Sequence, residues 1–325
     1  MYNYTYKQHF KFGYDADWFN PRWDKDSQWH VQYGQCEYRP TSFRDEVLRV
    51  ARLVENESFR LGLPIDVMFS GGSESEMMLR SFTEQDIPVR VHIMRFKDGH
   101  NQHDIASAEQ FIQTTGIVPQ YHELDILKFW EKEAFDYAER ARCVSPQLLS
   151  TMWLMDQLDG IPCLGSAECY LSYGDLNKYQ YWDQEQGKLI RNELTQYPKR
   201  PWYMHEREKI AAWYRHAMLT DRPAVPGYFQ YTPEVMLSFL EDPITQSLVD
   251  CKMYGKLSNQ STKKSVYERY FPNMIQQTKT TGFESIMQQD AVIRRELYRQ
   301  WGSYSAEALI EYNQLIKHLQ GEHYE

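Results

Sequence analysis

Hydrophobic positions recur every three or four residues from about Thr41 onward, and a short apolar run follows them. The spacing predicts a helix that begins after Thr41-Ser42, because hydroxyl side chains at this place cap free backbone N–H groups. Its apolar positions are Phe43, Val47, Leu48, Val50, Ala51 and Val54. The run that follows, 65–69, is uninterrupted enough to predict a buried strand, and it ends at a Gly-Gly pair.

The same two patterns then alternate over about 100 residues. Helical spacing is found at 75–84, around Ile105 to Gly116, at 126–142 and at 146–159, and strand-like runs occur at 89–96, 120–124 and 161–165. Alternating strands and helices predict an α/β fold, in which a parallel sheet is flanked by helices. Beyond residue 205 the pattern is mostly helical, at 206–219, 233–241, 264–270 and 286–317. We therefore expect a mainly helical C-terminal part packed beside the sheet.

Three regions follow from these patterns. Residues 1–40 are rich in aromatic side chains but show little periodicity, and we expect an irregular segment that packs onto the main body. Residues 41–204 form the predicted α/β domain. Residues 205–325 form the helical region, which we expect to contribute to the active site.

Charge and composition exclude several classes of function. The 325 residues contain 36 Lys and Arg against 45 Asp and Glu, a net charge of −9. Strong non-specific binding to nucleic acid is not expected, because phosphate neutralisation needs a basic face. No run of 18 apolar residues is found, so no membrane span is expected, and Met1–Lys7 lacks the apolar run of a secretory signal. The five scattered cysteines fit a reducing compartment, and we expect a cytoplasmic protein.

The segment between the first predicted strand and the next helix carries the clearest chemical signal. It comprises Ser70, Gly71, Gly72, Ser73, Glu74 and Ser75. Glycines allow a tight turn and a close approach to a ligand, and the following helix directs free N–H groups and its positive end at the turn. The segment is neither a Walker A loop nor a dinucleotide fingerprint. From spacing alone, an anion cradle and a plain strand–helix turn remain equally good interpretations.

This segment resembles the Ser-Gly-Gly-x-Asp-Ser signature of the PP-loop ATP pyrophosphatase superfamily, with Glu74 in the Asp position. The resemblance implies a HUP-type α/β fold, in which the loop holds the pyrophosphate of ATP together with Mg²⁺. The chain between 41 and 285 also resembles, in order, the synthetase domain of asparagine synthetase. The segments concerned are 41–61, 91–96, 100–106, 165–173 and 264–283.

The resemblance assigns roles to individual residues. Ser70 to Ser75 bind ATP, the strand containing Met94 and Arg95 contacts adenosine, and Gly165, Ser166 and Glu168 approach the metal-bound phosphates. Glu74 and Glu168 hold Mg²⁺, and Lys279 stabilises the charge that develops at the α-phosphate. From the residues alone, Lys279 is equally well a solvated loop lysine, and the segment after 165 a plain strand end.

The sequence departs from this family in the spacing between Lys279 and Gly282, which is one residue longer, and in two further ways that bear on the activity. Only about 40 residues precede the synthetase-like part, so the glutaminase half is not represented and the resemblance implies an amine from solution or from a separate donor protein. Leu164 and Ala167 occupy positions where the family has Glu and Asp. A leucine cannot accept the proton of an attacking amine. The resemblance therefore supports the expectation of ATP binding more strongly than that of asparagine synthesis.

The predicted function is an ATP-dependent, AMP- and pyrophosphate-forming ligase that makes an amide or other C–N bond on an unidentified acceptor. Two alternatives stay open: a PP-loop enzyme that modifies a nucleobase in tRNA or DNA, and a catalytically inactive nucleotide-binding protein. Three other features favour structural roles: exposed histidines at a helix start for His100 and His103, idle thiols for Cys163 and Cys169, and packing for the N-terminal aromatic residues.

Overall fold

The computed structural model describes residues 10–14, 17–18, 29–33, 38–141, 143, 146–165, 181–183, 188–190, 206–223, 232–240, 242–244 and 259–274. Its strands are β1 (Phe10–Tyr14), β2 (Asp17–Trp18), β3 (Trp29–Tyr33), β4 (Ile65–Met68), β5 (Arg90–Phe96), β6 (Gln120–Leu124), β7 (Ile161–Leu164), β8 (Tyr181–Asp183) and β9 (Lys188–Ile190). Its α-helices are α1 (Phe43–Leu61), α2 (Ser73–Thr83), α3 (Gln102–Thr115), α4 (Ile126–Glu131), α5 (Glu133–Ala141), α6 (Pro146–Asp156), α7 (Glu206–Leu219), α8 (Pro233–Leu240) and α10 (Asn259–Tyr270).

The central sheet is parallel and has the order β6-β5-β4-β7. Helices α2 and α3 connect the first three of these strands in one direction across the sheet, and the chain then returns to place β7 on the other side of β4. The strand order therefore reverses at β4, as in doubly wound sheets. This confirms the predicted α/β class, a parallel sheet flanked by helices.

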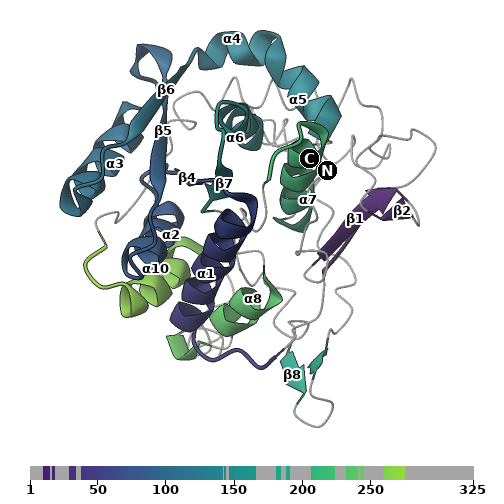
Figure 1. Cartoon of the computed structure of the whole chain (residues 1–325), viewed down its shortest axis with the longest axis vertical. Helices are drawn as coiled ribbons and strands as arrows, with labels where there is room; N and C mark the ends of the chain where they lie inside the picture. The colour runs from purple at the N-terminus through teal and green to yellow at the C-terminus, as the bar shows by residue number, and fades with distance from the viewer. Residues whose placement is uncertain are drawn as a thin grey trace, which may run out of the picture.

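Alternate residues of each strand point to opposite faces of the sheet, which gives two apolar clusters. On one face Val67, Val91 and Ile161 pack against α1, α2, α3, α8 and α10. On the other face Met68, Met94 and Leu164 pack against α4, α5, α6 and α7 (Figure 1). The C-terminal helices α7, α8 and α10 thus complete both faces, as expected of a helical part packed beside the sheet.

The predicted elements are found with small differences at their ends. Helix α1 begins after Ser42, whose side chain accepts a hydrogen bond from Asp45 N–H, and α3 ends at Gly116 in the left-handed conformation. The helix predicted at 126–142 is two helices, because the backbone leaves helical geometry at Lys132. The helix predicted at 286–317 lies outside the described residues.

The N-terminal expectation needs a correction. Residues 1–40 are not wholly irregular, because β1 pairs antiparallel with both β2 and β3. Antiparallel pairing satisfies the backbone N–H and C=O groups that an irregular segment would leave to water. The proposed boundaries at 40 and 204 remain predictions.

A buried ionic cluster lies inside the sheet. Asp66 is 0% exposed and accepts hydrogen bonds from Arg90 Nε at 2.6 Å, from His92 Nε2 at 3.0 Å and from Gly160 N–H at 2.8 Å. Burial by itself would raise the pKa of Asp66, but the hydrogen bonds from His92 and Arg90 bring it below its ordinary value. Asp66 thereby joins β4, β5 and the turn before β7 at the end of the sheet opposite the 70–75 segment.

No helix among the described residues has both the length and the apolar character needed to cross a membrane.

The substitution Asp66→Asn tests this cluster. Breaking a buried charge pair should lower the free energy of unfolding by on the order of 3 kcal/mol. The matched control is Asp159→Asn, because Asp159 is 83% exposed and contacts the same Arg90; it should cost less than about 1 kcal/mol. Urea unfolding measures both. Equal losses would contradict the assignment.

The hydrogen bonds to Asp66 also predict how the stability of the fold depends on pH. The pKa of Asp66 is depressed in the folded state, so its contribution is complete above its ordinary pKa of 3.8 and is lost as the pH falls through the folded-state pKa. The wild-type chain should lose more stability between pH 5 and pH 2 than the Asp66→Asn variant. Parallel curves for the two proteins would exclude this contribution.

Candidate functional site

The 70–75 segment turns where the strand order reverses, and Gly71 makes the turn sterically feasible. Its φ is +74°, a conformation that favours glycine. A Cβ at this position would lie 2.7 Å from the backbone nitrogen of Ala108 in α3 and 2.9 Å from its Cα. The loop therefore rests directly on the backbone of α3, which leaves no room for any side chain at position 71.

Gly165 makes a second close approach, from the end of β7. A Cβ there would lie 2.7 Å from the Cα of Ser75 and 2.8 Å from the carbonyl oxygen of Glu74. The chain leaving β7 thus begins against the first turn of α2. The structure thus places Gly165, the first residue of the second predicted segment, next to the 70–75 loop. The rest of that segment, 166–173, lies outside the described residues.

Hydrogen bonds among the loop residues form a closed ring. Ser75 Oγ donates to the Gly72 carbonyl at 2.9 Å, and Ser70 Oγ lies 3.1 Å from Ser75 Oγ. Because the single Ser75 hydroxyl proton goes to Gly72, Ser70 donates in the second contact. Gly72 N–H in turn donates to Ser70 Oγ at 3.4 Å. The ring fixes the shape of the loop without using the first N–H groups of α2.

Two helices begin beside this loop. The N-cap residue of α2 is Gly72 and that of α3 is Asn101, and neither caps its helix with a side chain. Asn101 instead accepts from Phe96 N–H at 2.7 Å and donates to the Met94 carbonyl at 2.9 Å, which closes the β5–α3 turn. The first N–H groups of a helix have no acceptor within it, and its N-terminus carries a partial positive charge. The arrangement is suited to an anion.

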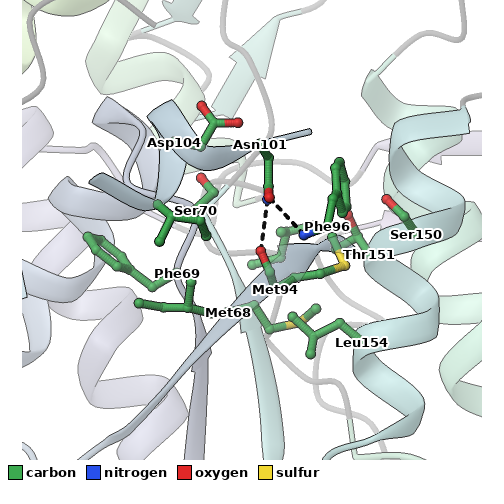
Figure 2. Close-up of a pocket in the computed structure, with 13 residues that line it drawn as sticks. Met68, Phe69, Ser70, Met94, Phe96, Asn101, Asp104, Ser150, Thr151 and Leu154 are labelled. Atoms are coloured by element: carbon green, nitrogen blue, oxygen red, sulfur yellow. Dashed lines mark hydrogen bonds between the residues drawn. The ribbon is translucent and has the colours of Figure 1, made fainter. Parts of the chain in front are cut away.

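A cavity of about 100 Å³ opens at the carboxyl ends of β4 and β5. Figure 2 shows Ser70 and Asp104 on the side of α2 and α3, with Ser150 and Thr151 of α6 facing them. The lining residues are Met68, Phe69, Ser70, Ile93, Met94, Phe96, Asn101, Asp104, Ile105, Ser150, Thr151, Leu154 and Leu164. The cavity has an apolar floor and a polar rim, as small-molecule sites commonly do.

Of the two residues predicted to contact adenosine, Met94 and Arg95, only one lines the cavity. Met94 lines the cavity. Arg95 does not: its guanidinium bonds Glu109 at 2.8 Å and lies 3.4 Å from the Tyr121 ring centre, which holds it against α3 and β6. Successive side chains of a strand point in opposite directions, and that of Arg95 points toward Glu109 and Tyr121. Any contact of Arg95 with a ligand there would have to be made by its backbone.

Glu74 is half-buried in the first turn of α2 and accepts a hydrogen bond from Ser73 Oγ at 3.2 Å. The other predicted metal ligand, Glu168, lies outside the described residues, as do Ser166 and Lys279. Within the described ranges no group of three or more His, Cys, Asp or Glu could hold a metal by itself. Glu74 nevertheless fits Mg²⁺, which is commonly bound by one or two carboxylates together with substrate phosphates.

Cys163 is buried beneath this site. Burial raises the pKa of its thiol well above the ordinary value, and the charge of Asp66 adds to the effect. Since the thiolate is the reactive form, Cys163 is not a nucleophile at neutral pH. Its predicted structural role agrees with this position, and Cys169 lies outside the described residues.

Sequence reasoning missed the contribution of α6. Ser150 and Thr151 line the cavity, although their helix was predicted only as a packing element. The signal was present, because two adjacent hydroxyl residues interrupt an otherwise apolar segment between Leu148 and Met155.

Comparisons with known proteins leave the family open. No family model matches the sequence, and no curated protein matches it. Among solved structures, the chain matches an NMN synthetase from Francisella tularensis, with a TM-score of 0.32 and 11% sequence identity. The match covers 82% of this chain and 98% of that one. At this level of similarity, function has to be argued from the site.

The substitution Gly71→Ala should destabilise the fold because it adds a backbone clash to the cost of a positive φ. Gly116→Ala is the matched control, since its φ is +71° but no atom lies within 4 Å of the added Cβ. We expect the control to cost about 1–2 kcal/mol and Gly71→Ala to cost at least about 1 kcal/mol more, measured by thermal or urea unfolding. Identical losses would show that the loop does not rest on α3.

Proposed function

We propose that this chain binds Mg·ATP at the 70–75 loop and uses it to adenylate an acceptor, with release of pyrophosphate. The observation that carries the proposal is the meeting of two glycine-packed backbone segments with two helix N-termini at the point where the strand order reverses. Open α/β sheets bind their ligands at this point, outside the carboxyl ends of the strands. The proposal agrees with the resemblance of the loop to the PP-loop signature.

Electrostatics make the metal necessary in this proposal. The N-terminus of α2 attracts phosphate, but Glu74 already lies in its first turn and would repel it. Glu74 would hold a magnesium ion that arrives with the nucleotide, and the ion would supply positive charge to offset this repulsion and to neutralise the leaving pyrophosphate. The loop N–H groups and hydroxyls bind the remaining phosphate oxygens.

We place the base of the nucleotide in the cavity. At about 100 Å³ it is smaller than the roughly 300–1,000 Å³ of a complete ligand site, so it suits one ring system rather than a whole nucleotide. Met94 and Leu154 offer apolar surface to the faces of such a ring, and Ser150 and Thr151 offer hydroxyls to its edge. The phosphates would then extend from Ser70 along the loop.

The proposed reaction is one of positioning and charge stabilisation. A carboxylate or carbonyl oxygen of a small-molecule or nucleobase acceptor attacks the α-phosphorus, and pyrophosphate leaves. A nitrogen nucleophile, from solution or from a separate donor, then displaces AMP to form a C–N bond. Such steps need in-line geometry and electrostatic stabilisation rather than a protein nucleophile. Lys279, and Glu168 with the metal, are the residues proposed to assist.

One observation favours a second candidate, a nucleotide-binding protein that forms no amide. Leu164 lines the cavity at the position where the resembling family has a proton-accepting glutamate. An apolar side chain there cannot take a proton from an amine. In this case the chain would bind Mg·ATP without forming AMP.

Glu74→Gln tests the metal-bridged proposal, because it keeps the shape of the side chain and removes its charge. Calorimetric titration should show Mg·ATP affinity reduced about tenfold or more, and AMP formation should fall with it. The matched control, Glu84→Gln, changes the exposed acid at the other end of α2 that pairs with Arg44, and should leave both unchanged.

Three results are decisive. AMP and pyrophosphate formed by the wild-type chain, with acceptor and amine mixtures, support the ligase. ATP binding without AMP supports the second candidate. No binding of Mg·ATP by the folded wild-type chain would exclude both.

A further inference from the structure

Asp104 is the one charged side chain among the 13 residues described above as lining the cavity. It is 12% exposed and lies in the first turn of α3, where the positive end of the helix stabilises a negative charge. His103 Nε2 lies 3.8 Å from Asp104 Oδ1, which is beyond hydrogen-bond distance. A carboxylate that lines a cavity with an apolar floor is suited to a ligand that offers hydrogen-bond donors.

The packing of α3 places Asp104 at the junction between the cavity and the 70–75 loop. Ala108, against which Gly71 packs, follows Asp104 by four residues, so the two lie on the same face of α3, about 6 Å apart along its axis. Asp104 is the nearer of the two to the start of α3, which follows the carboxyl end of β5. Figure 2 shows Asp104 on the same side of the cavity as Ser70, the first residue of the loop.

The chemistry of a carboxylate limits what it can bind at this junction. It accepts hydrogen bonds and donates none, and it repels phosphate groups. A sugar hydroxyl donates a hydrogen bond, and the sugar of a nucleotide connects its base to its phosphates. With the base in the cavity and the phosphates extending from Ser70 along the loop, the sugar is therefore the part of the nucleotide that belongs beside Asp104.

A carboxylate has two oxygens and can accept from both hydroxyls of a ribose. In dinucleotide-binding sheets an acidic side chain likewise binds a ribose hydroxyl. A nucleotide that lacks one hydroxyl would leave part of the carboxylate without a donor in a largely closed site, which is costly. Ser150 and Thr151 lie on the opposite wall, where the proposed function places the edge of the base, and do not contribute to this selection.

We propose that Asp104 makes the site selective for ribonucleotides, by accepting hydrogen bonds from the 2′- and 3′-hydroxyls of the ribose. The inference rests on the proposed function, which places the base in the cavity and the phosphates at the loop. It separates the roles of two acids: Glu74 in α2 holds the metal, and Asp104 in α3 binds the sugar.

Calorimetric titration with Mg·ATP, Mg·2′-deoxyATP and Mg·3′-deoxyATP tests the inference. The wild-type chain should bind Mg·ATP about tenfold or more tightly than either deoxynucleotide, because each of these lacks a hydrogen bond to a charged group. In Asp104→Ala the affinity for Mg·ATP should fall to within about threefold of the affinities for the deoxynucleotides. Asp104→Asn keeps one acceptor oxygen, so its preference should be intermediate, and it replaces Asp104→Ala if that variant does not fold.

Two further variants serve as controls. Glu109→Gln changes another acid of α3, whose carboxylate accepts from Arg95 and Tyr121 outside the cavity, and it should leave all three affinities unchanged. Thr151→Val, on the opposite wall, should lower the three affinities by the same factor and so preserve their ratios.

Two results would overturn the inference and leave the proposed function standing. One is a wild-type chain that binds Mg·ATP and the deoxynucleotides equally tightly. The other is an Asp104→Ala variant that keeps the wild-type ratios, even if all three affinities fall, because the carboxylate would then act on the metal or the phosphates. A folded wild-type chain that binds none of the three nucleotides overturns the proposed function itself, and the role of Asp104 with it.

Discussion

Close contact between backbones, with no side chain in between, is the constraint on which the site depends. Gly71 rests on the backbone of Ala108 and Gly165 on the backbone of Ser75 and Glu74. These two contacts bring the loop after β4 against the middle of α3, and the end of β7 against the start of α2. The serine ring then holds the loop through its own hydroxyls.

Negative side chains lie beside positive groups at both ends of the sheet. The partial positive charge at the N-terminus of α2 favours an anion, and it already interacts with the negative charge of Glu74 in the same turn. At the other end of the sheet, Asp66 is compensated within the protein by Arg90 and His92.

The sequence predicted the fold where local pattern and tertiary packing agree. The apolar run 65–69, the spacing of α1 and the glycine after α3 are local signals, each confined to a few neighbouring residues. Signals of this kind were sufficient to predict the strands of the sheet and the helices around it. The strands β1 and β3 were missed although Phe10, Phe12 and Tyr14 alternate with Lys11 and Gly13, because the alternation is short and lies between turn residues. Glycine and serine spacing at 70–75 predicted a tight strand–helix turn, and only the resemblance to the PP-loop signature added a role for it. The contact of Gly165 with Ser75 and the bonds from Arg80 to residues 272 and 273 could not be, because they join positions about 90 and 190 residues apart and carry no local signal.

The most direct measurement is a crystal structure of the chain with Mg²⁺ and a non-hydrolysable ATP analogue. Phosphate oxygens should lie within hydrogen-bond distance of the N–H groups at the start of α2, with the metal between them and Glu74 and the base against Met94. Density for the analogue at another surface, or a 70–75 loop that stays closed to it while the nucleotide binds elsewhere, would contradict the claim that this bend holds a triphosphate.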